Sequence, residues 1–146
     1  VHGAAVMGQL ELKEYLLNFA RSFIYSTALS PHCIASVISS YEYLAESAQE
    51  ERKNLQGNIH FFKEKAKKLN LQEYFVGSNS AIQSCIIQDN TKVKSVSNKL
   101  NDKGFNVKAI LSPTVPEGQE RLRFCIHSNN SKEEIGLVLE LLSNYL

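Results

Sequence analysis

The feature that most constrains this chain is a helical pattern of apolar residues that extends from about Ser30 to Leu69. Ser30 followed by Pro31 is a strong helix start, because serine caps the first free amides and proline fits the first helical turn. The pattern is longer than an ordinary globular helix. It predicts one long helix, or two helices joined by a kink, with Gly57 as a candidate bend. An element of this kind usually connects two parts of a larger structure.

Two elements are predicted before this helix. Gly3–Met7 is apolar and rich in small residues, which favours a short buried strand. Glu11–Phe23 has apolar residues at helical spacing, with glutamates at its favourable N-terminal end. The sequence begins at Val1 with no initiator methionine and no polar lead-in, so we expect the chain to be a piece of a longer protein.

The sequence pattern changes after Asn70, where short apolar runs alternate with helical patterns. Ser131 and Glu134 form a capping box that opens the last helix, and Gly104 supplies a left-handed helix end. The pattern predicts strand, helix, strand, strand and helix at residues 81–88, 91–102, 105–111, 121–127 and from 131 onward. The chain therefore divides into residues 1–30, a connecting helix at 31–69 and a small α/β domain at 70–146.

Composition excludes several function classes. The 16 basic and 15 acidic residues leave a net charge of +1, which gives no support for a nucleic-acid or anionic-membrane partner. The three cysteines, Cys33, Cys85 and Cys125, are widely spaced, so we expect no disulfide and no metal site. We expect each to be a small buried hydrophobic residue in a reducing compartment, the cytoplasm.

The strongest chemical signal lies between two prolines and the strand that follows. Pro113-Thr114-Val115-Pro116 is a stiff turn, and Arg121 and Arg123 then share one face of a strand. A guanidinium presented in this way suits a carboxylate, because its planar fork matches both oxygens. The alternative is that the arginines form surface ion pairs with Glu117 or Glu120, which contribute little.

A second candidate is the pair of hydroxyls at Ser26 and Thr27, just before the predicted helix start. Hydroxyls and free amides at a helix N-terminus suit a phosphate. The alternative is that both residues only cap or turn the chain.

Five segments in register together resemble a known family: Gly3-Ala4-Ala5-Val6, Phe23 to Pro31, Ser80 to Gln83, Pro113 to Pro116, and Arg121 to Arg123. They are similar to the C-terminal portion of the α-oxoamine synthases, which are pyridoxal-phosphate enzymes of the aspartate-aminotransferase fold. The resemblance implies an α/β fold, with residues 1–30 ending the large cofactor domain, 31–69 forming the connector and 70–146 forming the small domain of a fold-type I transferase.

The resemblance also implies a reaction. The family condenses an amino acid with an acyl-CoA or acyl-carrier-protein thioester and releases CO2 and the thiol. Its Schiff-base lysine lies just before the position that matches Val1, so no catalytic residue is expected in this chain, which alone should be inactive.

By the same resemblance, Arg123 binds the amino-acid carboxylate and Thr114 lies near the acyl end of the thioester. Ser26 and Thr27 reach the cofactor phosphate of the neighbouring subunit, which implies a homodimer. Leu111 stands where some members carry an arginine, so a charge contact at that position is not expected.

Three alternatives remain open at this point. The protein is a glycine-using member of the family, or a non-catalytic subunit that lacks the lysine. The third alternative, a free-standing α/β regulatory domain that binds a carboxylate through Arg123, fits the long helix least well.

Overall fold

The computed structural model describes residues 3–146, which group into two compact units, one up to Gln49 and one at Glu50–Leu146. Val1 and His2, the first residues of the apolar N-terminal segment, lie outside the described residues. The three-part division made from the sequence stays a prediction.

All the regular secondary structure described in the first unit is helical. It contains α1 (Leu10–Phe19), α2 (Arg21–Ile24) and α3 (Pro31–Glu46). The predicted helix at 11–23 is therefore two helices, separated at Ala20. The predicted strand at Gly3–Met7 is wrong, because residues 3–9 form no regular element. A strand needs a neighbouring strand that accepts and donates its backbone hydrogen bonds. No strand is present among the described residues of this unit.

The long helical pattern is two helices, which confirms the second of the two predicted forms. Ser30 accepts a hydrogen bond from the Cys33 amide (3.3 Å) and starts α3 as expected. The helix ends at Glu46, and α4 (Gln49–Lys68) follows after two turn residues. The bend predicted at Gly57 is wrong, because Gly57 lies inside α4. Burial of one face of α4, which includes Ile59 and Phe62, stabilises the helix despite the glycine.

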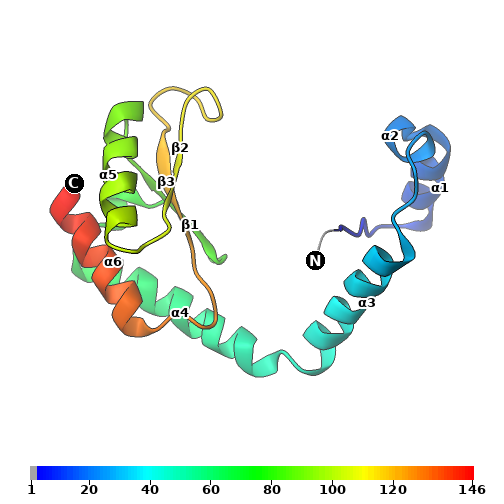
Figure 1. Cartoon of the computed structure of the whole chain (residues 1–146), viewed down its shortest axis with the longest axis horizontal. Coiled ribbons are helices and arrows are strands. Elements are labelled where there is room, and N and C mark those ends of the chain that lie inside the picture. The colour runs from blue at the N-terminus through cyan, green and yellow to red at the C-terminus, as the bar shows by residue number, and fades with distance from the viewer. Residues whose placement is uncertain (1–2) are drawn as a thin grey trace. The chain divides into compact units, whose positions relative to one another are not determined.

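The second unit contains a three-stranded antiparallel sheet in the order β1-β3-β2. The strands are β1 (Ile82–Ile86), β2 (Lys108–Ile110) and β3 (Arg121–Cys125), and a short 3-10 helix, η1 (Gln72–Tyr74), precedes them. The helices α5 (Asn90–Asp102) and α6 (Lys132–Tyr145) lie on the same side of the sheet in Figure 1. The predicted order of strand, helix, strand, strand and helix is confirmed.

Two local signals in this unit form as the sequence predicted. Ser131 Oγ accepts from the Glu134 amide at 3.1 Å, and Glu134 Oε2 accepts from the Ser131 amide at 2.9 Å, which completes the capping box. Gly104 has φ of +89° at the end of α5, a backbone conformation that side chains with a Cβ rarely adopt.

One hydrophobic core joins the sheet to α4, α5 and α6. Three phenylalanines meet in it. Phe62 lies 5.2 Å from Phe75 and 5.7 Å from Phe124 between ring centroids, in edge-on and tilted arrangements that aromatic rings prefer. Leu122 of β3 and Leu139 of α6 are fully buried in the same core. None of the helices in the described residues is both long and apolar enough to cross a membrane.

The core makes a direct prediction for stability. Leu139→Ala should lower the free energy of unfolding by about 2–5 kcal/mol, because it removes a fully buried side chain and leaves a cavity. Leu137→Ala, on the same helix but 50% exposed, should cost about 1 kcal/mol or less. Urea unfolding of the chain and both variants measures the difference. Equal losses for the two variants would mean that α6 does not pack as described.

Candidate functional site

The proline turn is tied to the start of α5, and this tie positions the first residue of β3. The Ser112 amide donates to Asn90 Oδ1 at 3.1 Å. The Asp89 amide donates at 3.3 Å to Oε2 of Glu120, whose side chain is almost completely buried. The Ile87 amide also donates to the Glu120 carbonyl (2.9 Å). The chain therefore enters β3 at a fixed point.

Strand β3 then presents its arginines on the face opposite the core, as the alternation predicted. Arg121 is half-buried and its guanidinium donates to Gln119, at 2.9 Å to the carbonyl and 3.4 Å to the side chain. Arg123 is exposed and makes no hydrogen bond or ion pair within residues 3–146. The alternative of ion pairs with Glu117 or Glu120 does not occur in this structure. Arg123 is thus a free guanidinium on a fixed backbone.

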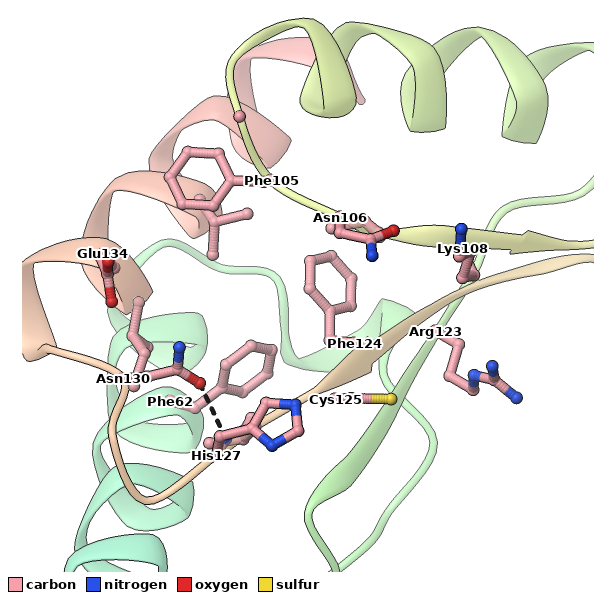
Figure 2. Close-up of a pocket in the computed structure, with 15 residues that line it drawn as sticks. Phe62, Phe105, Asn106, Lys108, Arg123, Phe124, Cys125, His127, Asn130 and Glu134 are labelled. Carbon is pink, nitrogen blue, oxygen red and sulfur yellow. Dashed lines mark hydrogen bonds between the residues drawn. The ribbon is translucent and has the colours of Figure 1, made fainter. Parts of the chain in front are cut away.

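A cavity of about 530 Å³ lies alongside the second half of β3. Its polar lining comes from the end of the sheet where β2 begins and β3 ends, from the loop after β3 and from α6. Figure 2 shows these residues: Asn106, Lys108, Arg123, Cys125, His127, Asn130 and Glu134. The volume lies in the range of small-ligand sites. The rest of the lining is apolar and includes the core residues Phe62 and Phe124, and the charged members are Lys108, Arg123 and Glu134.

The far end of this cavity is held by a buried amide. Asn58 Nδ2 donates to the His127 carbonyl at 3.0 Å and to the Asn130 carbonyl at 2.8 Å, and the Asn58 side chain is 7% exposed. Asn130 Oδ1 in turn accepts from the His127 amide at 2.8 Å. This loop is therefore fixed to α4 rather than free to move into the cavity.

The other predicted site residues lie elsewhere. Thr114 is exposed in the proline turn and is not part of the cavity lining. Ser26 and Thr27 are exposed in the first unit, where Ser26 Oγ donates to the Phe23 carbonyl at 3.3 Å. Helix α3 begins four residues after Thr27, so both hydroxyls precede a helix N-terminus as expected. Their roles stay predictions.

Neither Lys108 nor His127 was among the site residues predicted from the sequence, and both line the cavity. The sequence carried no local signal for Lys108, because its neighbour Arg123 is separated from it by the whole proline turn. Within residues 3–146, no group of three or more His, Cys, Asp or Glu side chains is placed to hold a metal ion.

The expectation of three buried cysteines is correct only for Cys85. Its side chain is fully buried in β1, and burial raises the pKa of its thiol to about 12. Cys33 is half-buried, and Cys125 is exposed at the cavity because it shares the outward face of β3 with Arg123. All three are free thiols.

With this geometry in place, comparison with known proteins identifies the family. The family model described as aminotransferase class I and II matches residues 1–142, and the chain belongs to this family. The fold is that of the fold-type I enzymes, and the sheet and helices of residues 50–146 form a small α/β unit.

Individual relatives narrow the likeness to one kind of enzyme. The chain is 38% identical over 98% of its length to 8-amino-7-oxononanoate synthase of Photorhabdus laumondii, and 36% identical over 99% to that of Emericella nidulans. It spans 37% and 36% of these two proteins, little over a third, and corresponds to their C-terminal portion.

Solved structures agree. The crystal structure of 8-amino-7-oxononanoate synthase from Francisella tularensis superposes with a TM-score of 0.75 at 31% identity, covering 93% of this chain and 39% of that one. A variant of serine palmitoyltransferase from S. paucimobilis has the same fold, with a TM-score of 0.77 at 23% identity over 90% of this chain and 33% of that one.

The cysteines give a prediction about access to the cavity. Iodoacetamide at about pH 8 should alkylate Cys125 of the folded chain and leave Cys85 unmodified, because a thiol with a raised pKa is protonated at that pH and is shielded. Peptide mass spectrometry gives the extent at each residue. In urea, both should react equally. Modification of Cys85 at the rate of Cys125 under folding conditions would contradict the described core.

Proposed function

We propose that the whole protein is an 8-amino-7-oxononanoate synthase and that this chain supplies its substrate-positioning portion. In this reaction, L-alanine condenses with a pimeloyl thioester in biotin biosynthesis. A bond forms between the alanine Cα and the acyl carbon, the thiol leaves, and the alanine carboxyl group leaves as CO2. The observation that carries the proposal is the match to relatives of that name, at 36–38% identity over almost the whole chain.

Arg123 is the residue that we assign to the amino-acid carboxylate. Its guanidinium is exposed, has no partner within residues 3–146, and stands on the central strand of the sheet. Two parallel hydrogen bonds to a carboxylate would fix the direction of the bonds at Cα, which is a positioning contribution to the rate. Thr114, exposed in the turn that leads into the same strand, is assigned to the acyl end of the thioester.

The described residues fit part of a site for pyridoxal phosphate. Ser26 and Thr27 present exposed hydroxyls ahead of α3, and the Thr27 hydroxyl makes no hydrogen bond within residues 3–146, so it is available as a donor. Phosphate is the group that such donors suit. When bound, pyridoxal phosphate supplies an electron sink for the carbanion at Cα. We assign both hydroxyls to the phosphate of a neighbouring subunit in a homodimer.

We further propose that this segment alone is inactive, because the resemblance places the cofactor lysine ahead of Val1. The cytoplasm is the proposed location, since the three cysteines are unpaired.

The reaction itself gives the first test. Full-length protein with pyridoxal phosphate, L-alanine and pimeloyl-CoA should release CoA, which a thiol reagent detects continuously. Glycine should replace L-alanine poorly. CoA release with glycine but not with L-alanine would instead indicate a glycine-using relative, of the 2-amino-3-ketobutyrate CoA ligase or 5-aminolevulinate synthase type. No release with either amino acid would favour a non-catalytic subunit.

The role of Arg123 gives the second test. Arg123→Ala in the full-length protein should raise the KM for L-alanine by about tenfold or more, because it removes a charged hydrogen-bonding partner of the carboxylate. Arg121→Ala is the matched control, since Gln119 already holds that guanidinium. Its effect should be much smaller. Steady-state rates against L-alanine at saturating thioester measure both, and an unchanged KM in Arg123→Ala would remove Arg123 from the site.

A further inference from the structure

Lys108 stands directly opposite Arg123 in the sheet. The register pairs Lys108 of β2 with Arg123 of β3, and directly opposite residues of an antiparallel pair present their side chains on the same face. Both side chains are exposed, and Lys108, like Arg123, makes no hydrogen bond or ion pair within residues 3–146. Like charges placed opposite one another destabilise a sheet. An anion bound by both side chains would offset this cost.

The backbone that carries Lys108 is fixed from the core side. Buried Ser97 donates its hydroxyl to the Val107 carbonyl at 2.7 Å, and the Val107 amide donates to Asn101 Oδ1 at 3.2 Å. These bonds hold the residue before Lys108 against α5. The backbone of Lys108 is therefore held in place, whereas its side chain can change conformation. Figure 2 shows the charged ends of Lys108 and Arg123 extending in different directions.

The cavity offers these two cations no competing partner. Glu134 is the only acidic residue in its described lining, and Glu134 Oε2 already accepts from the Ser131 amide in the capping box. In Figure 2 Glu134 lies on α6, at the opposite side of the cavity from Lys108 and Arg123. No carboxylate among residues 3–146 forms an ion pair with either cation.

We propose that Lys108 is a second binding residue for the amino-acid carboxylate held by Arg123. Arg123 provides the planar fork, and Lys108 adds a point charge that strengthens binding. This assignment rests on the proposed function, because that function supplies the amino acid. It goes beyond the function by giving the site a second cation.

The experiment uses full-length protein and three substitutions. Lys108→Gln removes the charge and keeps the length of the side chain, and Lys108→Arg keeps the charge. Lys94→Gln is the matched control, since Lys94 is exposed on α5 and outside the cavity lining. Isothermal titration gives the Kd of L-alanine, and steady-state rates give the KM of each substrate separately. Thermal melting checks that every variant is folded.

Lys108→Gln should raise both the Kd and the KM of L-alanine about fivefold, the effect of one nearby charge in a partly exposed site. Lys108→Arg and Lys94→Gln should stay close to the parent protein. The difference should shrink at about 1 M salt, where screening is nearly complete. The KM of the thioester should not change.

Two results overturn the inference. An unchanged Kd of L-alanine in Lys108→Gln shows that the charge does not reach the carboxylate. A rise confined to the KM of the thioester shows that Lys108 serves the anionic groups of the acyl donor instead. If the full-length protein binds L-alanine but releases no CoA, the proposed reaction fails while the titration still decides on Lys108. Absence of any L-alanine binding overturns both.

Discussion

The alternation of side chains along β3 is the constraint on which both the core and the candidate site depend. Leu122 and Phe124 point into the core, so Arg123 and Cys125 point outward. A slip of one residue would put the guanidinium into the core and the leucine outside, and burying an unpaired charge is far more costly than any gain at the surface. Because β1 and β2 both pair with β3, the hydrophobic core itself fixes where the guanidinium stands.

Buried polar side chains hold the two ends of this strand. Glu120 binds the start of α5 as the chain enters β3, and Asn58 binds the loop that follows it. Each buried polar group is used to bind backbone, and no buried side-chain nitrogen or oxygen in the described residues lacks a partner. A site on a strand held in this way has its geometry set before any ligand arrives, which is what precise orientation of a substrate requires.

Sequence signals within a few residues of one another predicted the helices and strands well. Contacts between residues far apart in the sequence could not be predicted. The capping box at Ser131, the left-handed Gly104 and the order of the strands and helices all follow from local pattern. The strand at Gly3–Met7 failed because a strand depends on a partner that apolar content cannot reveal. The free state of Arg123 and the position of Lys108 opposite it both depend on register, which is set by contacts across the proline turn.

The division of polar groups in residues 50–146 bears on the chemistry of the site. Buried polar side chains form hydrogen bonds to the backbone. The two exposed cations of the sheet, Lys108 and Arg123, have no partner among residues 3–146. Their contributions differ in kind. A planar guanidinium fixes the angle of a carboxylate, whereas a flexible ammonium adds attraction without direction. In the proposed site, orientation of the amino acid would depend on Arg123 and the strength of its binding on Lys108, so substitutions at Lys108 would change affinity without disturbing geometry.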